Sequence, residues 1–236
     1  MNVHYQPIVE LETGAVVRVE AFCRLGDGAL GQVAASEFLP LAERSGLMRE
    51  LTQGVIVQVL TDRASWRTQL PVAINLSQAN LFESDFPERV TSLLARFNVE
   101  PSQLTFELND GIQNSISPEE RQAMNALAVN GVRFSLDGFD FSRSRFTALS
   151  VTRLPISEIK IDAKLLLPCG PPDHAVRRSM AFARDASLDV VVKSVENTRE
   201  IDALRAIGCT LAQGFAFGVP MESATFASRM EAFAAV

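Results

Sequence analysis

The sequence predicts an α/β barrel built as a single domain. Short runs rich in β-branched and aromatic residues alternate with stretches whose apolar residues follow helical periodicity. Alternation of this kind indicates βαβ units and a mainly parallel sheet, because parallel strands require a crossover connection. About eight such units in 236 residues favour a closed barrel over an open sheet. No Gly/Ser-rich linker or block of charge divides the chain, so we expect one domain over residues 1–236.

The predicted strands share a centre of valine, isoleucine, leucine or phenylalanine. In chain order they are HYQPIVEL (4–11), VVRVEAFCRL (16–25), PVAINLS (71–77), QLTFELN (103–109), VRFSLDGF (132–139), EIKIDAK (158–164), DVVVKSVE (189–196) and LAQGFAF (211–217). The predicted helices cover residues 36–44, 47–68, 86–97, 118–130, 173–187, 198–207 and 222–234. The helix at 118–130 carries the clearest signals, because Ser117 and Pro118 precede two acids and Gly131 follows its end.

Composition restricts the class of protein. Hydrophobic residues make up 47% and charged residues 21%, which is typical of a folded globular chain. No apolar run reaches the roughly 18 residues of a membrane span, and the N-terminus lacks a signal peptide, so we expect a cytoplasmic protein without membrane insertion. Cys23, Cys169 and Cys209 form neither a disulfide framework nor a zinc spacing. The net charge of −6 argues against direct nucleic-acid binding but allows one small anionic ligand.

Polar side chains recur at or near the C-terminal end of each predicted strand. They are Glu20, Asn75, Glu107, Asp137, Lys160, Asp162, Glu196 and Gln213. An acid at one strand end is commonly a helix cap, but in a parallel barrel these ends converge on one mouth. Several are oxygen donors of the kind that bind Mg²⁺, Mn²⁺ or Ca²⁺, and carboxylates so close together repel one another unless a cation is present. The sequence therefore predicts one polar cluster that needs a cation.

A series of short motifs runs in order from Tyr5 to Pro220. They are Tyr5-Gln6-Pro7-Ile8-Val9, Glu20-Ala21-Phe22-Cys23-Arg24, Phe38-Leu39-Pro40-Leu41-Ala42-Glu43, Asn75-Leu76-Ser77, Glu107-Leu108-Asn109-Asp110, Asp137-Gly138-Phe139, Lys160-Ile161-Asp162, Val195-Glu196 and Gln213-Gly214-Phe215. This order resembles the EAL-domain family, the cyclic di-GMP phosphodiesterases and their inactive relatives. The resemblance implies a TIM-like (β/α)8 barrel. It also implies that active members use two divalent metals at the barrel mouth to hydrolyse cyclic di-GMP to linear pGpG.

The resemblance assigns roles to individual residues. The first-metal ligands of the family match Glu20, Asn75, Glu107 and Asp137, a remnant site for one Mg²⁺ or Ca²⁺ ion, with no other cofactor required. Lys160 matches the lysine that supports the attacking water or the phosphate. The expected ligand-binding residues are Gln6, Pro7, Ile8, Glu20, Phe22, Arg24, Asn75, Glu107, Asp137, Phe139, Lys160, Glu196, Gln213, Gly214 and Pro220. Tyr5, Phe22, Phe139 and Phe141 either stack on guanine or belong to the core.

Two departures from the family pattern concern catalysis. Asp-Asp-Phe-Gly becomes Asp137-Gly138-Phe139-Asp140, which removes a carboxylate of the second metal, and Lys193 replaces a catalytic glutamate. The plain alternatives are a turn glycine and a surface lysine. If Lys193 lies at the mouth, we expect its ammonium to pair with Asp137 or Glu107. The loop 140–144 and Asp110 also differ from the family. We therefore expect no catalytic residues beyond the remnants Lys160 and Glu196, and no enzymatic activity.

Three functions are compatible with these residues. The first is a catalytically inactive cyclic di-GMP receptor in bacterial second-messenger signalling. The others are a nucleotide-independent adaptor, which binds a protein partner of unknown identity, and a weak one-metal phosphodiesterase. Apolar residues on more than one face of the predicted helix 47–68 either pack on the barrel or form a homodimer surface. Family members commonly follow sensory or diguanylate-cyclase domains, so the chain resembles a module of a longer protein.

Overall fold

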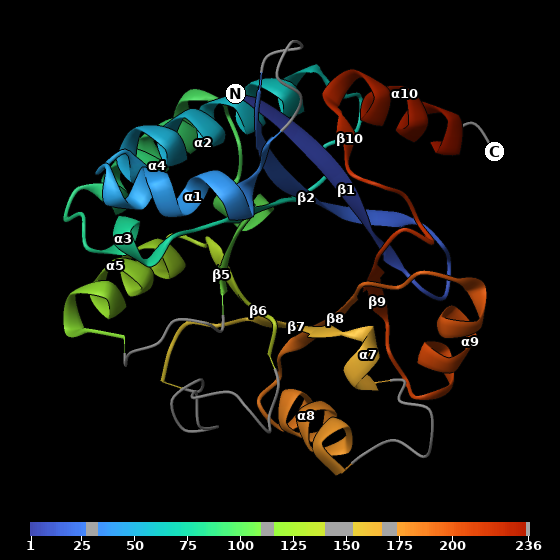
Figure 1. Cartoon of the computed structure of the whole chain (residues 1–236). Helices are drawn as coiled ribbons and strands as arrows, with labels where there is room; N and C mark the ends of the chain where they lie inside the picture. Colours follow the sequence, from blue (N-terminus) through green and yellow to red (C-terminus); the bar gives the residue numbers. More distant parts are fainter. Residues whose placement is uncertain (27–32, 110–115, 140–152, 167–173, 235–236) are drawn as a thin grey trace.

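Eight strands close into a barrel in the computed structural model (Figure 1). The structure describes residues 1–26, 33–109, 116–139, 153–166 and 174–234. The barrel strands are β1 (Asn2–Glu10), β2 (Val16–Leu25), β4 (Val72–Asn75), β5 (Leu104–Asn109), β6 (Arg133–Asp137), β7 (Glu158–Asp162), β8 (Asp189–Lys193) and β9 (Leu211–Gln213). Because β1 pairs with both β2 and β9, the sheet has no open edge along this ring. The predicted TIM-like (β/α)8 barrel is confirmed.

One strand departs from the parallel arrangement. β1 runs antiparallel to β2 and β9, whereas the pairs from β2 through β4 to β9 are parallel. Only residues 11–15 connect β1 to β2, too few for the crossover that a parallel pair requires. Gly14 lies in this connection with a φ of +72°, and its amide donates to the Glu10 carbonyl at 2.8 Å. The short connection therefore forces a hairpin.

Helices surround the barrel on its outer side (Figure 1). They are α1 (Ala35–Arg44), α2 (Met48–Ser65), α4 (Phe86–Arg96), α5 (Pro118–Val129), α8 (His174–Asp185), α9 (Thr198–Ala206) and α10 (Ser223–Ala234). Each matches a predicted helix within a few residues. Elements too short to show a period were not predicted: β3 (Val33–Ala34), α3 (Gln78–Leu81), the 3₁₀ turn η1 (Pro101–Gln103), α7 (Ala163–Leu166) and β10 (Met221–Glu222). Asp110, the loop 140–144 with Phe141, and Cys169 lie outside the described residues.

The start of α5 forms the cap that the sequence predicts. The Ser117 hydroxyl accepts from the Glu120 amide at 3.1 Å, and the Ser117 amide donates to Glu120 Oε2 at 2.6 Å. This reciprocal pair is a capping box, which satisfies two amides that the first turn of a helix leaves unpaired. Gly131 follows the helix with a φ of +100°, a backbone conformation that favours glycine.

Strand alternation directs apolar side chains outward and polar side chains inward. In β5, Phe106 lies 5.7 Å from Phe86 of α4 and 6.1 Å from Phe134 of β6, measured between ring centroids. Its neighbours Thr105 and Glu107 are on the opposite face, toward the barrel interior. The apolar core therefore lies between the barrel and the helices. Polar and charged groups such as Thr105 and Glu107 lie in the barrel interior.

An ion pair crosses the barrel interior below the mouth. Arg18 of β2 contacts Glu158 of β7 at 2.6 Å, and the two side chains are 7% and 0% exposed. β2 and β7 lie opposite one another in the strand order around the ring. The pair therefore spans the barrel, and its burial means that loss of either partner would leave an uncompensated charge.

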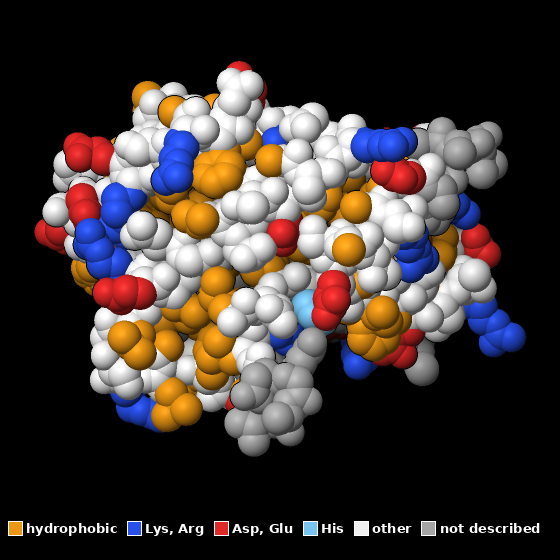
Figure 2. All heavy atoms as spheres, turned by 90° about the horizontal axis from the view of Figure 1, so that it is seen from above, with side chains coloured by type: hydrophobic (Ala, Val, Ile, Leu, Met, Phe, Trp, Pro, Cys, Tyr) orange, Lys and Arg blue, Asp and Glu red, His pale blue; other side chains and the backbone are white. Residues whose placement is uncertain are grey.

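Charged side chains of both signs are interspersed on the outer surface (Figure 2). In one cluster, Arg49 of α2 and Arg89 of α4 both bind Glu83 and Asp85, at distances of 2.5 to 3.0 Å. Hydrogen bonds from Arg49 and then Arg89 lower the pKa of Asp85 to about 2. The Arg49–Asp85 pair is exposed, with both side chains 44% exposed, and exposed pairs contribute little to stability. Packing therefore holds these helices in place. None of the helices in the described ranges combines the length and apolar character of a membrane span.

The capping box predicts a measurable loss of stability. Ser117→Ala removes the hydroxyl that accepts from the Glu120 amide and should lower the free energy of unfolding by about 1 kcal/mol. The matched control is Ser92→Ala, an exposed serine within α4, which should stay within about ±0.5 kcal/mol. Chemical denaturation monitored by circular dichroism measures both. Equal effects of the two substitutions would contradict the assigned role of Ser117.

Candidate functional site

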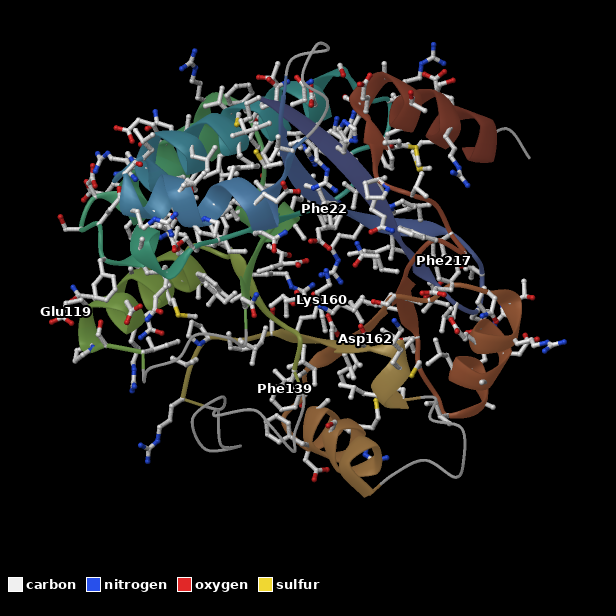
Figure 3. All side chains as sticks on the ribbon, in the orientation of Figure 1. Phe22, Glu119, Phe139, Lys160, Asp162 and Phe217 are labelled. Carbon is white, nitrogen blue, oxygen red and sulfur yellow. The ribbon has the colours of Figure 1, made fainter. Side chains whose placement is uncertain are left out.

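The carboxyl ends of the parallel strands surround a cavity of about 280 Å³, the mouth cavity. Figure 3 shows Lys160 near the centre of the ring of strands, with Phe22 on the side of β2 and Asp162 at the end of β7. The cavity is lined by Gln6, Glu20, Phe22, Asp137, Lys160, Lys164, Lys193, Ser194, Glu196, Gln213, Gly214 and Phe215. The polar cluster that the sequence predicts at one mouth is therefore largely assembled there.

Lys160 occupies the centre of this cluster. Its Nζ donates to Glu20 Oε2 at 2.6 Å and to Glu107 Oε1 and Oε2 at 2.8 and 2.9 Å. The side chains of Lys160, Glu20 and Glu107 are 1%, 7% and 0% exposed. Lys160 therefore lies between two buried carboxylates and holds them together by charge-assisted hydrogen bonds.

The three groups set one another's ionisation. Burial and the charge of Glu20 raise the pKa of Glu107 well above its usual value. Burial also acts to raise the pKa of Glu20, but the charge and hydrogen bond of Lys160 outweigh it and the pKa is lowered. Burial acts to lower the pKa of Lys160, yet the charges of Glu107 and Glu20 leave that pKa above its ordinary value. Lys160 thus stays charged, and any proton shared by the two acids resides on Glu107.

Side-chain amides complete the hydrogen bonding of Glu20. Asn75 Nδ2 donates to Glu20 Oε1 at 2.8 Å, and Gln213 Nε2 donates to Glu20 Oε2 at 2.9 Å. Gln213 Nε2 also lies 3.1 Å from Gln6 Oε1, and Gln6 Nε2 donates to the Gly218 carbonyl at 2.9 Å. β1, β2, β4 and β9 are therefore linked at the mouth through one carboxylate.

Lys193 forms the second charged pair of the mouth. Its Nζ donates to Asp137 Oδ2 at 2.9 Å and lies 2.7 Å from Asp137 Oδ1. The two side chains are 28% and 23% exposed, so this pair is half-buried, unlike the Lys160 cluster. The expectation that Lys193 pairs with Asp137 or Glu107 is confirmed for Asp137, and a surface position is excluded.

The predicted metal ligands do not present free oxygen atoms to a common point. Lys160 lies between Glu20 and Glu107, Asn75 directs its amide NH₂ at Glu20, and Lys193 lies against Asp137. Within the described ranges, no group of three or more acidic, histidine or cysteine side chains is arranged to hold a metal ion. In this arrangement the donor set fits ammonium groups and does not fit a divalent cation.

A second, larger cavity lies on the other side of Phe22. It has a volume of about 600 Å³, and Phe22 lines both cavities. Its apolar lining comes from β2, β4, α1, α2 and the residue after β4, and includes Ala21, Cys23, Leu39, Met48, Leu51, Val55, Ile74 and Leu76. Polar residues, among them Asn75 and Glu107, also line it. Burial raises the pKa of the Cys23 thiol, so this cysteine is a packing residue and not a reactive one. This apolar cavity adjoins the charged mouth.

Several predicted site residues lie away from both cavities. Ile8 is fully buried one layer deeper in β1, and the Phe139 ring stacks on Phe182 of α8 at 5.8 Å. Tyr5 is also buried, with its hydroxyl donating to Asp62 at 2.6 Å. The Arg24 guanidinium lies 5.8 Å from the centroid of the Phe22 ring and donates to the Cys23 carbonyl oxygen. Pro7, Ile8, Arg24, Phe139 and Pro220 do not line either cavity.

Sequence reasoning missed three residues of the mouth cavity. Lys164 lies in α7 two residues after Asp162, Ser194 follows Lys193, and Phe215 is the last residue of the Gln213-Gly214-Phe215 motif. Phe215 is 67% exposed. Ser194 has a φ of +63° and donates through its hydroxyl to Asp162 Oδ2 at 2.9 Å. Position next to a predicted site residue was the only signal that could have identified them.

The Lys160 cluster predicts a large and pH-dependent loss of stability. Lys160→Met leaves Glu20 and Glu107 buried without a counter-charge and should lower the free energy of unfolding by about 3–5 kcal/mol near neutral pH. Burial and mutual repulsion would raise the folded-state pKa of both acids above the unfolded value of about 4.3. The folded variant then binds protons more tightly than the unfolded chain, so the loss should grow as pH rises from about 5 to about 8.

Denaturant titrations at several pH values measure this effect. Lys164→Met is the matched control, because Lys164 is exposed. It should change stability by no more than about 0.5 kcal/mol at any of these pH values. A Lys160→Met protein that matches this control would show that the buried pair contributes nothing to stability.

Comparison with known proteins identifies the family of this chain. The model of the EAL domain matches residues 1–220. The bifunctional diguanylate cyclase/cyclic di-GMP phosphodiesterase MucR of Pseudomonas aeruginosa is 30% identical over 225 residues, which cover 92% of this chain and 33% of MucR. The oxygen sensor protein DosP of Escherichia coli is 30% identical over 225 residues, 92% of this chain and 28% of DosP. The chain thus spans about a third or less of these curated relatives.

A solved structure extends the likeness to three dimensions. The PaMucR phosphodiesterase in its c-di-GMP complex superposes with a TM-score of 0.84 at 28% identity, covering 95% of this chain and 98% of that chain. The closed barrel, the motifs at the strand ends and the match over residues 1–220 lead to one conclusion: the chain belongs to the EAL-domain family.

Proposed function

We propose that this EAL domain binds cyclic di-GMP without hydrolysing it and acts as a receptor module in second-messenger signalling. The family match and the relative named as a cyclic di-GMP phosphodiesterase support the ligand. The observation that carries the proposal is the Lys193 ammonium on Asp137, because a lysine has replaced a carboxylate at a position where the family's chemistry needs one.

Loss of hydrolysis follows from the charges at the mouth. Two-metal hydrolysis requires carboxylates that hold both ions and activate water between them. Gly138 has no side chain, and Lys193 brings a positive charge that repels a cation. Gly138 also has a φ of +75°, a backbone conformation that favours glycine. The turn-glycine interpretation is therefore compatible with the loss of a carboxylate at this position. Without an acid/base group, the rate falls by a further factor of about 10² to 10⁴.

Retention of binding follows from the two cavities. Cyclic di-GMP combines anionic phosphodiesters with purine rings, and the mouth cavity is lined by the ammonium groups of Lys164 and Lys193 and by the Gln6 amide. The apolar cavity begins at Phe22, and the exposed ring of Phe215 stands at the opening. A charged cavity beside an apolar one suits a ligand of this composition.

The first test is turnover. Incubation with cyclic di-GMP and Mn²⁺, followed by chromatography, should give no linear pGpG at rates typical of enzymes, roughly 1 per second or faster. The matched comparison is Gly138→Asp combined with Lys193→Glu, which restores two carboxylates. No atom lies within 4 Å of the position of an added Cβ at Gly138, and Asp tolerates its left-handed backbone better than most residues. Rapid turnover by the unmodified domain would refute the proposal.

The second test is affinity. Calorimetric titration should give a dissociation constant in the micromolar range or tighter, a binding free energy of about −8 kcal/mol or better. A receptor of this kind should also show a rise in melting temperature with ligand. Absence of heat and of any thermal shift at millimolar ligand would instead favour the nucleotide-independent adaptor.

The third test concerns Phe215. If its exposed ring stacks on a base, Phe215→Ala should weaken binding by about 1–3 kcal/mol, roughly 5- to 150-fold. Its melting temperature should remain unchanged, since little of the side chain is buried. Phe82→Ala is the matched control, because Phe82 is 58% exposed and lies outside both cavities. Equal affinities of the two variants would exclude a stacking role.

A further inference from the structure

Two lysines of the mouth form direct ion pairs with three of its acids. Glu20, Glu107 and Asp137 supply the acids, and Lys160 and Lys193 supply two ammonium groups in direct contact with them. Glu20, Glu107 and Asp137 each have a lysine Nζ within 2.9 Å, and Glu196 also lines the cavity. The cluster therefore needs no dissolved cation to hold its carboxylates together.

We propose that Lys193 is a built-in counter-ion that replaces a divalent cation, so that an anionic phosphodiester binds this site independently of metal ions. The proposal rests on the proposed function, since it takes cyclic di-GMP as the ligand. It goes further in assigning to Lys193 both the neutralisation of Asp137 and a direct contact with the ligand's phosphate.

The geometry of Lys193 supports the second role. Asp137 lies on β6 and Lys193 on β8, on either side of β7, so the side chain reaches across the strand end and into the mouth cavity. An ammonium has three N–H donors, and contact with one carboxylate uses at most two of them. Because Lys193 also lines the mouth cavity and is 28% exposed, a donor is available to an anion there.

The neighbouring acid does not compete for Lys193. Asp162 pairs in register with Lys193, yet its Oδ1 accepts from the Lys164 amide at 2.9 Å and its Oδ2 accepts from the Ser194 hydroxyl at 2.9 Å. Ser194 makes this bond from a left-handed backbone with a φ of +63°. The turn after β8 thus satisfies Asp162 locally and leaves Lys193 to Asp137.

A divalent cation would have to displace these contacts. Between Glu20 and Glu107 it would replace a fully buried ammonium that makes three short contacts. At Asp137 it would lie against the positive charge of Lys193. Both positions therefore favour the tethered ammonium over a free ion.

The experiment measures binding of cyclic di-GMP by calorimetry in EDTA and in millimolar Mg²⁺. The unmodified domain should bind with dissociation constants that agree within about threefold. Lys193→Glu should bind at least about tenfold more weakly in EDTA, because an ammonium contact is lost and a second carboxylate faces Asp137. Mg²⁺ should restore much of that affinity, since the variant presents two carboxylates to the ion.

Lys164→Glu is the matched control, because it makes the same charge change on another lysine of the mouth cavity. It should weaken binding to a similar extent in both solutions and create no dependence on Mg²⁺. Binding by the unmodified domain only when Mg²⁺ is present would overturn the inference and leave the proposed function standing. A Lys193→Glu variant without dependence on Mg²⁺ would overturn it as well.

A thermal-shift assay with Mg²⁺ alone gives a readout without nucleotide. The melting temperature of the unmodified domain should not change with Mg²⁺, whereas that of Lys193→Glu should rise. If no cyclic di-GMP binds in either solution, the proposed function fails, and this assay still decides whether Lys193 takes the place of a cation. A shift of the unmodified domain equal to that of the variant would refute that role.

Discussion

The pairing of buried charges across the barrel is the constraint on which the rest of the structure depends. β2 and β7 lie opposite one another, and two ion pairs join them: Arg18 with Glu158, and Glu20 with Lys160. The order of charges reverses between the strands, so a shift of β7 by two residues would place like charges together. Buried charges without partners cost several kcal/mol each. The two layers therefore favour a single register of the barrel as well as its closure.

The pairing of these buried charges fixes the geometry of the mouth. Once Lys160 is fixed between Glu20 and Glu107, the amides of Asn75 and Gln213 complete the bonding of Glu20. Gly214 then passes so close to the Val195 backbone that an added Cβ would lie 2.1 Å from its carbonyl oxygen. Side chains from neighbouring strands thus stand at fixed positions around one cavity, as a preorganised binding site requires.

The sequence predicted the helices, the strands and the convergence of the polar strand ends better than it predicted individual side-chain contacts. Alternation identified all eight barrel strands, and their polar ends were expected to meet because parallel strands point the same way. The alternation along a strand shows which face a residue occupies but not how deep in the barrel it lies. Ile8 was therefore predicted at the mouth, although it lies a layer below Gln6. The stacking of Phe139 on Phe182 joins segments far apart in the chain. The position of Lys160 between two acids likewise depends on the width of the barrel, which no local pattern specifies.

In the proposed receptor, Lys193 contributes both to the lost chemistry and to the retained affinity. A divalent cation offers open coordination positions and lowers the pKa of bound water, whereas an ammonium has a single charge and only N–H donors. Lys193 can therefore neutralise Asp137 and bind a phosphate but cannot generate a metal-bound nucleophile. Because the ammonium is tethered, it is always present at the site, while a free ion must be bound from solution. Ligand binding then depends on the nucleotide concentration alone and not on that of a metal.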